Sequence, residues 1–408
     1  MCLDEFSIRL LAVIDDGYMI QLELYKRKKY EKVLIVASTS GFIKGFLLSD
    51  AKMLQELGYE VHCAANHKAM VTFKAEELFP KYNIIFHQVD FPPNRPLSRE
   101  TLSAARQYLD IVNNIDFDLI HCHSPIVGAI VRLLGVKYRK NGGKIIYTTH
   151  GLAFSKDSGW KSKLFYGTTE WLCAKLCDKV ITINHDDFNM MKKLSPRNTV
   201  YINGVGVNTE KFRHVNINRN EYRESLGITA EQKMVLTVGE ISKRKNQKVI
   251  VKALSKLDNS YVFVICGKVM NDSAIYNELL EIAEQLHVNL KFLGFRSDVP
   301  EILKCADVFV LPSLREGLCF AGVEALASGI PVVGSNVKGV KDFIVDGETG
   351  YLSDPYDADM FAKKIELASS RGQRKKMESK CIEKAEEFSA TVSHGQMSAI
   401  YEEVLNIR

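Results

Sequence analysis

The stretch VFVLPSLREGLCFAGVEALASGIPVV, residues 308–333, contains a complete strand–loop–helix–strand unit. Its apolar, β-rich run at 308–312 is typical of a strand buried on both faces, and a helix is predicted to follow the loop and to run to Ser328. Gly329 suits the position after a helix C-terminus, and Pro331 opens a second short apolar run. Two strands joined by a helix in this order pair in parallel, so the unit predicts an open α/β sheet.

The same alternation extends over most of the chain. Before residue 203, seven β-rich apolar runs alternate with helical patterns, at 32–37, 59–65, 83–89, 118–122, 144–149, 178–184 and 199–202. The segment NGVGVNTEKF interrupts this rhythm, which then resumes with runs at 233–239, 261–267, 289–294, 307–312, 331–334 and 350–352. We therefore predict an α/β fold of two Rossmann-like β/α/β domains that face each other across a cleft.

The domain boundaries follow from this rhythm. We expect the first domain at 31–205, the second at 206–390 and a C-terminal helix at 391–408. Residues 1–30 do not share the strand–helix pattern, and their basic cluster follows their short apolar run, which is the reverse of a signal peptide. We treat them as an N-terminal extension of unknown role.

Composition places the chain among ordinary globular proteins. Of its 408 residues 46% are hydrophobic and 25% are charged, which argues against a disordered chain or a disulfide-stapled mini-protein. The net charge of +5 is too small to indicate nucleic acid binding, and no apolar stretch reaches the roughly 18 residues of a membrane span. The nine Cys include no Cys-x-x-Cys pair, so we interpret them as reduced core thiols of a cytosolic protein.

The positive charge is unevenly distributed. Lys and Arg outnumber Asp and Glu by 27 to 22 through residue 210 and equal them, 27 to 27, after it. The first domain is therefore the one that could face an anionic surface such as lipid headgroups. Its segment 155–179 mixes aromatic residues with lysines, which suits either a helix at a membrane surface or an amphipathic helix that packs on the core.

Ligands of open α/β sheets bind beyond the carboxyl ends of the strands, beside helix N-termini. In the loop after 308–312, Glu316 lies at the junction with the helix and Glu324 about two turns further along. A diphosphate could bind the helix dipole and the unpaired backbone N–H groups of Gly317, Leu318, Cys319 and Phe320. Glu324 would then accept hydrogen bonds from a ribose diol, and Glu316 would reach a sugar. A helix-end charge and a solvated glutamate remain the alternative.

A basic cluster follows a strand of the second domain. In VGEISKRKNQ, residues 238–247, the strand ends at Gly239, and Lys243, Arg244 and Lys245 come directly after it. Cations at the carboxyl end of a strand point toward the predicted cleft, where they suit the negative charges of a diphosphate. A solvated basic turn is the alternative interpretation.

Two loops of the first domain reach the same cleft. KIIYTTHG, residues 144–151, places His150 just beyond a strand, where it could hydrogen-bond a sugar hydroxyl or could simply pack within the loop. TSGFIKG, residues 39–45, is predicted to be a loop whose glycines permit a close approach of the backbone to a ligand.

Two other patterns could bind a metal but are weak. His121 and His123 lie on alternate positions of a strand end, yet the sequence supplies no third ligand nearby. Asp116 and Asp118 match an Asp-x-Asp pattern that can hold Mg²⁺ or Mn²⁺, yet they precede their strand, at the wrong end for the cleft. We expect no metal and no resident cofactor.

Taken together, these pieces resemble one family. The Glu316–Glu324 block, VGE with KRKN, FLGFRSDV, the NGVGVNTEKF linker and YTTHG occur in the order seen in family-4 retaining glycosyltransferases of the GT-B fold. The resemblance covers about residues 32–400 and is greatest to bacterial enzymes that build capsular polysaccharide or exopolysaccharide.

The resemblance implies roles for individual residues. Glu316 and His150 would act in catalysis, with Glu316 on the donor sugar, while Lys245 would bind the phosphates and Glu324 the ribose. The nucleobase would be bordered by Gly294, Phe295 and Arg296. The chain departs from the family at Glu240, where many members have Arg; a carboxylate there would repel phosphates unless Lys243 or Arg244 compensates.

The implied activity is transfer of a sugar from a nucleoside diphosphate donor, in the first instance a UDP-sugar, to a hydroxyl of a polyprenyl-linked or saccharide acceptor. Transfer would retain the anomeric configuration and need no metal. The first domain would bind the acceptor, with Gly41, Phe42 and Lys44 as one wall, and the C-terminal helix would cross back to it. The enzyme would work in the cytoplasm, at the inner face of the plasma membrane, without nucleic acid.

Three other functions remain open from the sequence. One is a UDP-sugar epimerase of similar fold, which would act without an acceptor. The second is a metal-dependent transferase that uses Asp116 and Asp118. The third is a non-catalytic nucleotide-sugar-binding protein, which Glu240 would favour.

Overall fold

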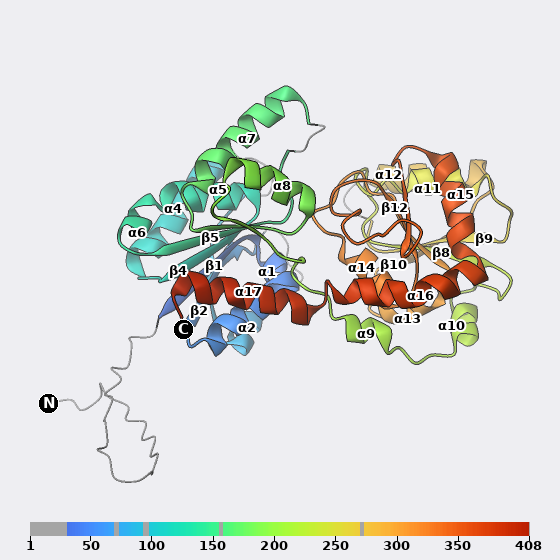
Figure 1. Ribbon diagram of the computed structural model, residues 1–408, viewed down its shortest axis with the longest axis horizontal. Coiled ribbons are helices and arrows are strands. Elements are labelled where there is room, and N and C mark those ends of the chain that lie inside the picture. Colours follow the sequence, from blue (N-terminus) through green and yellow to red (C-terminus); the bar gives the residue numbers. More distant parts are fainter. Residues whose placement is uncertain (1–30, 69–72, 93–97, 155–157, 270–272, 408) are drawn as a thin grey trace, which may run out of the picture.

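Two α/β lobes lie side by side in the computed structural model of the protein (Figure 1). The residues that it describes are 31–68, 73–92, 98–154, 158–269 and 273–407. The extension expected at 1–30 lies outside the described residues.

The N-terminal lobe is built on a seven-stranded parallel sheet with the order β3-β2-β1-β4-β5-β6-β7. Its strands are β1 (Lys32–Thr39), β2 (Glu60–Asn66), β3 (Ile84–Gln88), β4 (Leu119–His123), β5 (Lys144–Thr149), β6 (Lys179–Thr182) and β7 (Thr199–Tyr201). Its helices are α1 (Ser40–Phe46), α2 (Leu48–Glu56), α3 (Ala75–Leu78), the 3₁₀ turn η1 (Phe79–Tyr82), α4 (Arg99–Asn114), α5 (Pro125–Leu134), α6 (Val136–Lys140), α7 (Trp160–Ala174) and α8 (His185–Leu194).

The C-terminal lobe has a six-stranded parallel sheet with the order β10-β9-β8-β11-β12-β13. Its strands are β8 (Lys233–Val238), β9 (Tyr261–Cys266), β10 (Asn289–Gly294), β11 (Val308–Leu311), β12 (Val332–Ser335) and β13 (Gly350–Ser353). The remaining helices are α9 (Thr209–Arg213), α10 (Arg219–Ser225), α11 (Lys248–Leu254), α12 (Ser273–Gln285), α13 (Val299–Cys305), α14 (Phe320–Ala327), α15 (Ala358–Ser369), α16 (Arg371–Glu386) and α17 (Ala390–Leu405). The predicted two-sheet α/β architecture is therefore confirmed.

Burial explains why the strands are continuous apolar runs. In β1, Leu34 and Val36 pack into one buried cluster, whereas Val33 and Ile35 pack into another on the opposite face. Successive side chains of a strand point to opposite faces, so a sheet covered by helices on both sides needs apolar residues at every position. The eight cysteines of the described chain are buried and free, which confirms their interpretation as core thiols.

The segment after β1 corrects one prediction. Residues 39–45 were expected to form a loop, but α1 begins at Ser40, directly after the strand. The cause is a side-chain cap, because Thr39 Oγ1 accepts a hydrogen bond from the Phe42 amide and so satisfies one of the free N–H groups at the helix start. Gly41, Phe42 and Lys44 therefore lie on a helix.

The C-terminal helix crosses between the lobes, as predicted. The preceding helix α16 packs on α14 of the C-terminal lobe, whereas α17 packs on α2 of the N-terminal lobe (Figure 1). At the crossing, the Val207 amide donates to the Phe388 carbonyl and the Ala390 amide donates to the Val207 carbonyl. Tyr401 anchors the far end, since its buried hydroxyl lies 2.7 Å from His121 Nδ1.

No helix within the described residues is both long and apolar enough to span a bilayer.

Candidate active site

A cleft of about 480 Å³ lies between the lobes, where loops from both sheets meet. The N-terminal lobe contributes Ser38 near the end of β1 and residues after β3, β4 and β5, and the C-terminal lobe contributes residues after β8, β11 and β12. Its lining includes Ser38, Ser124, His150, Arg244, Arg315, Glu316 and Lys338. These residues lie at or beyond the carboxyl ends of parallel strands, which is where open α/β sheets bind ligands.

The lobes touch at the edge of this cleft through Gly317. A side chain there would collide with the carbonyl oxygen of His150, so only glycine permits this approach. The carbonyl of Gly317 also accepts a hydrogen bond of 3.0 Å from Asn184 Nδ2 of the N-terminal lobe. The Gly317 position thus holds the loop that carries Glu316 directly opposite His150.

Glu316 is held between two cations. Its Oε2 accepts a 2.6 Å hydrogen bond from Arg244 Nη1, and its Oε1 lies 2.8 Å from Lys245 Nζ. Burial of the carboxyl opposes its ionisation, but Lys245 and Arg244 outweigh burial and lower its pKa. Glu316 is therefore a carboxylate at neutral pH, and Arg244 and Lys245 of the predicted basic cluster meet the predicted acidic residue, whereas Lys243 makes no ion pair with it among the described residues.

Glu240, the departure from the family pattern, has a partner. Its Oε1 lies 3.2 Å from Arg244 Nη2 and accepts a hydrogen bond of the same length from Ser242 Oγ. Arg244 thus bridges two carboxylates, Glu240 and Glu316. Within the described residues Lys245 makes one ion pair, with Glu316, and its Nζ also lies 3.9 Å from Cys319 Sγ and beside the Gly239 backbone, so it remains the cation best placed for an incoming anion.

The start of α14 supplies fewer free amides than predicted. The amide of Cys319 was expected to be unpaired, but it donates to the Gly339 carbonyl at 3.3 Å, because the loop after β12 folds over this turn. Within the described part of the chain, the amides of Gly317, Leu318 and Phe320 have no such acceptor. Three amides therefore remain for a ligand where four were predicted.

Glu324 lies one turn into α14 and is largely buried. Burial raises its pKa to about 7, an effect that the nearby Lys211 only partly offsets. No hydrogen-bond donor of the described residues reaches its carboxyl group. A desolvated carboxyl group without donors is suited to accept hydrogen bonds from a ligand's hydroxyls.

His150 faces Glu316 from the other lobe. Its Nε2 lies 3.0 Å from His123 Nδ1, and its ring packs edge-on against Phe42 with centroids 4.7 Å apart. Burial lowers the pKa of His150 to about 4, so the imidazole is neutral at pH 7. Its Nδ1 is left available to hydrogen-bond a ligand in the cleft.

A potential metal-binding group lies behind His150. Asp50, His121 and His123 each bring one ligand atom within 4.8 Å of the others, so the third ligand that the sequence seemed to lack is Asp50 of α2. However, both His121 nitrogens are already hydrogen-bonded, to Tyr401 and Thr148. Only Asp50 and His123 Nε2 are free to ligate, and two ligands are too few for a stable site.

The predicted acceptor wall is only partly at the cleft. Phe42 reaches it through its contact with His150, whereas the exposed Lys44 ammonium lies 4.6 Å from the Phe73 ring centroid, and Gly41 does not line the cleft. A neighbour on α1, Phe46, stacks on Phe320 across the lobes with centroids 5.3 Å apart.

The residues expected near the nucleobase lie on the loop after β10. Phe295 is exposed, with Lys268 Nζ 4.8 Å from its ring centroid, and Arg296 pairs with Asp298. Neither lines the cleft itself. Arg315 and Lys338, which do line it, were not predicted, because single basic residues in loops carry no pattern.

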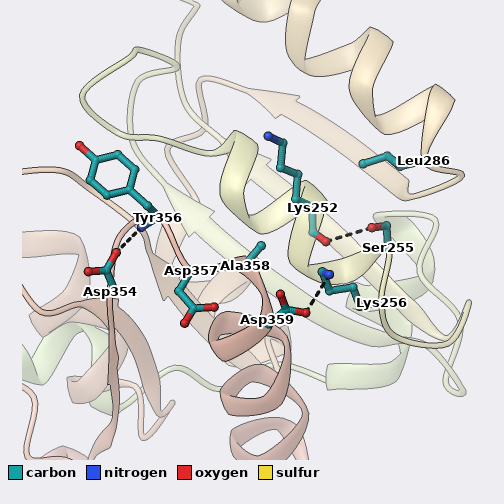
Figure 2. A pocket seen from close by; sticks show the side chains of 9 residues that line it. All are labelled: Lys252, Ser255, Lys256, Leu286, Asp354, Tyr356, Asp357, Ala358 and Asp359. Atoms are coloured by element: carbon teal, nitrogen blue, oxygen red, sulfur yellow. Dashed lines mark hydrogen bonds and ion pairs between the residues drawn. The ribbon is translucent and has the colours of Figure 1, made fainter.

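A larger hollow lies elsewhere on the C-terminal lobe, between α11 and the start of α15 (Figure 2). It measures about 710 Å³ and contains the Lys256–Asp359 ion pair, 2.8 Å long, and a hydrogen bond of 2.8 Å from the Tyr356 amide to Asp354. This open hollow lies on one lobe alone, so we assign the active site to the smaller cleft between the lobes.

Comparison with known proteins agrees with this geometry. Residues 47–211 match the family described as Glycosyltransferase Family 4, and residues 218–388 match Glycosyl transferases group 1. The "Putative glycosyltransferase EpsD" of Bacillus subtilis is 32% identical over 345 residues, which cover 82% of this chain and 87% of that protein.

Two further proteins are similar. The Escherichia coli UDP-Gal:alpha-D-GlcNAc-diphosphoundecaprenol alpha-1,3-galactosyltransferase is 31% identical over 60% of this chain and 64% of its own length. The crystal structure of Anabaena Alr3699/HepE in complex with UDP and glucose superposes with a TM-score of 0.74 at 17% identity, over 92% of this chain and all of that one, which establishes the likeness of the fold.

Proposed function

The chain belongs to the glycosyltransferases of group 1 and family 4, with the GT-B fold, and from this premise we propose that it transfers a sugar from a UDP-sugar to the hydroxyl of a lipid-linked saccharide. The observation that carries the proposal is the pair of facing groups in the cleft. Glu316, held by Arg244 and Lys245, stands opposite the neutral His150 of the other lobe.

The chemistry rests on stabilisation of the leaving group. As the bond from the sugar to the diphosphate breaks, negative charge grows on the phosphate oxygens and the sugar ring becomes cationic. Lys245 and the free amides of Gly317, Leu318 and Phe320 would bind the diphosphate, and Glu324 the ribose. Fixed donors of this kind bind the transition state more strongly than the ground state, and each contributes about 3–4 kcal/mol.

Retention of the anomeric configuration is part of the proposal. Among the described residues that line the cleft, Glu316 is the only carboxylate, and its two ion pairs make it a poor nucleophile. We therefore favour attack of the acceptor on the same face from which the phosphate leaves, with the departing phosphate taking the acceptor proton. His150 Nδ1 would position a sugar hydroxyl.

No metal is required in this mechanism. The charge that a divalent ion would supply comes from Lys245, from the amides and from the positive end of α14. Turnover in excess EDTA should equal turnover without it. A loss that added Mg²⁺ or Mn²⁺ restores would instead favour a metal-dependent transferase.

The acceptor class comes from a relative. The E. coli enzyme acts, by its name, on GlcNAc-diphosphoundecaprenol, and we carry over the class of lipid-linked saccharide as the acceptor. The exposed apolar side chains of α7 and their neighbouring lysines suit an anionic membrane surface at the inner face of the plasma membrane. Absence of co-sedimentation with anionic vesicles at low salt would remove the membrane part of the proposal.

A release assay tests the whole proposal. Purified protein is given a panel of nucleotide sugars, with and without a polyprenyl-diphosphate saccharide, and free UDP is measured. Acceptor-dependent release of UDP is expected. Conversion of the UDP-sugar without an acceptor would indicate an epimerase, and binding without turnover across the panel would indicate a non-catalytic protein.

A further inference from the structure

Three neighbouring hollows lead from the cleft between the lobes to the outer face of the N-terminal lobe, and each shares lining residues with the next. The active-site cleft shares Leu152, Ala153, Arg315 and Lys338 with a middle cavity of about 200 Å³. The middle cavity in turn shares Phe154 and Met190 with a groove of about 580 Å³ between α7 and α8. A single extended molecule could therefore occupy all three.

The far end of this path, which we call the α7–α8 groove, is apolar. It is lined by Phe154, Leu164, Trp171, Met190 and Leu194, with Lys163 at its rim. Leu164 is 64% exposed and Trp171 is 44% exposed, so substantial apolar surface stays in contact with water. Covering such surface with a hydrocarbon is favourable.

Among the described residues that line the middle cavity, one charged side chain has no ion-pair partner. Lys338 Nζ lies 3.0 Å from Asp187, and Lys341 Nζ lies 2.8 Å from Asp186, so these pairs neutralise each other. The side chain of Arg315 is exposed and makes no ion pair with the described residues. An anionic group between the cleft and the groove would therefore meet a free guanidinium, which binds phosphate well.

The three hollows thus follow one another in a fixed order. The cleft that can bind hydroxyl groups comes first, the Arg315 guanidinium lies next to it, and the apolar α7–α8 groove lies at the far end. We propose that the α7–α8 groove binds the hydrocarbon chain of the lipid-linked acceptor, whose phosphate lies against Arg315 and whose saccharide enters the cleft between His150 and Glu316. This inference rests on the proposed function for the nature of the acceptor, and it assigns α7 a role in substrate binding beyond contact with a membrane.

The two tryptophans of the chain allow a direct test, because both lie on α7. Trp171 lines the groove, whereas Trp160 does not and is 71% exposed. The variants Trp160→Phe and Trp171→Phe each leave one fluorescent reporter in the full-length protein. Farnesyl diphosphate, kept below its micelle concentration, should shift Trp171 emission to shorter wavelength and leave Trp160 unchanged, and inorganic diphosphate should shift neither.

Equal responses of both tryptophans would mean that the probe adsorbs generally on α7, and would overturn the proposal that the groove binds the hydrocarbon chain. No response of Trp171 at saturating probe would overturn it as well. UDP binding, measured separately in the same variants, keeps the two proposals apart. If UDP binds but Trp171 does not respond, only the role of the groove in binding the hydrocarbon chain is rejected. If UDP does not bind, the proposed function is rejected.

A matched pair of substitutions gives a second test. Leu164→Glu places a charge in the groove, and Leu172→Glu places the same charge on the same helix outside it, at a residue that is 46% exposed. Both sites are open to solvent, so both variants should fold. The affinity for farnesyl diphosphate should fall more than about tenfold in Leu164→Glu, a loss of about 1.4 kcal/mol, and stay within twofold in Leu172→Glu. Equal losses would indicate a membrane-like surface instead.

Discussion

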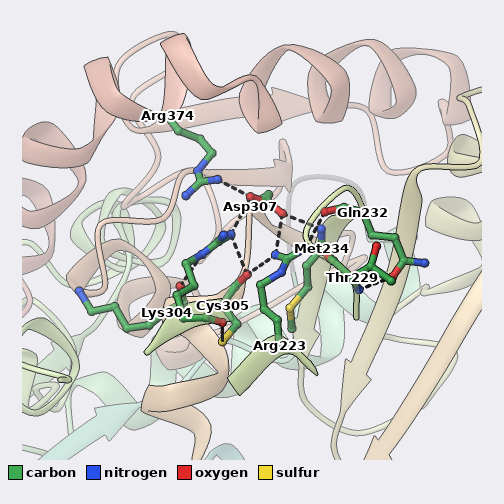
Figure 3. A network of polar contacts seen from close by, with 9 residues as sticks. Arg223, Thr229, Gln232, Met234, Lys304, Cys305, Asp307 and Arg374 are labelled. Carbon is green, nitrogen blue, oxygen red and sulfur yellow. Dashed lines mark hydrogen bonds and ion pairs between the residues drawn. The ribbon is translucent and has the colours of Figure 1, made fainter. Parts of the chain in front are cut away.

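A carboxylate surrounded by cations lies near each end of strand β11: Asp307 before the strand and Glu316 in the loop after it. The two networks differ in their partners and in their access to the cleft. At its start Asp307 is surrounded by donors (Figure 3): the Met234 amide at 2.7 Å and the guanidinium groups of Arg219, Arg223 and Arg374. At its end the chain continues to Glu316, which has two cations and an open cleft beside it.

The difference separates a structural network from a functional one. Arg223 is fully buried and also donates to the carbonyls of Cys305, Thr229 and Gln232, so the Asp307 network joins α10 to the sheet and its donors are directed to protein acceptors. In the proposed mechanism Lys245, beside Glu316, exchanges this partner for a phosphate of the donor. The parallel sheet explains the division, because only the carboxyl ends of its strands face the other lobe.

The largest expected effect on folding is at Asp307. Asp307→Asn should lower the free energy of unfolding by about 3–5 kcal/mol, because it leaves buried arginine without its counter-charge. Urea unfolding measures the change, and turnover per folded molecule should stay near that of the wild type. Glu383→Gln, which removes an exposed carboxylate paired with Lys380, is the control and should cost under about 1 kcal/mol. Equal costs in the two variants would contradict the comparison.

Glu316→Gln should show the opposite pattern. Turnover should fall about 10²–10³-fold, since the amide neither pairs with the cations nor supports positive charge on the sugar. The midpoint of unfolding should fall less than in Asp307→Asn, because Arg244 is about one-third exposed and keeps Glu240, and only the largely buried Lys245 loses its counter-charge. Separate measurement of kcat and of UDP affinity identifies the step affected. Wild-type turnover in this variant would show that Glu316 is a structural partner of Lys245 only.

A smaller effect, on the affinity for the donor, is expected at Glu324, one turn into α14. Only the ionised form of Glu324 accepts hydrogen bonds from both ribose hydroxyls, and its pKa is about 7 in the free protein. Donor affinity should therefore fall as the pH drops below 7, and Glu324→Gln should bind more than about tenfold more weakly at pH 8, with little dependence on pH. Calorimetry with a UDP-sugar is suitable, since its diphosphate does not titrate near neutrality. If the affinity of the variant depended on pH as that of the wild type does, the proposed contact between Glu324 and the ribose would be wrong.

The strands and the two-lobe plan could be predicted from the sequence because buried parallel strands require continuous apolar runs. The pairing of Glu316 with Lys245 could not. The two residues are far apart in the chain, and they meet because β8 and β11 are neighbours in the sheet, an order that local patterns do not encode. Asp50 was missed beside His121 and His123 for the same reason.

Two errors concern the segments that directly follow a strand. Residues 39–45 contain two glycines and suggested a loop, but the cap from Thr39 and the packing of Ile43 in the core favour α1. The Cys319 amide was counted as free because its acceptor, Gly339, comes from the loop after the next strand. Both cases show that a pattern identifies a strand end well, but the hydrogen-bond partners of the loop beyond it depend on tertiary contacts.

The smallest expected effect concerns Glu240, and it tests whether the Glu316 network is as open as the comparison requires. Glu240 and Arg244 are each about one-third exposed, and such ion pairs contribute about 0–1 kcal/mol. Glu240→Gln should therefore strengthen UDP binding by up to about fivefold, because Arg244 loses one competing carboxylate, and it should barely change the unfolding midpoint. Titration of UDP into the variant and the wild type at two salt concentrations measures the gain, which should shrink at high salt. A large loss of affinity would instead mean that Glu240 orients Arg244 for the donor, and that this end of β11 is as fixed as the other.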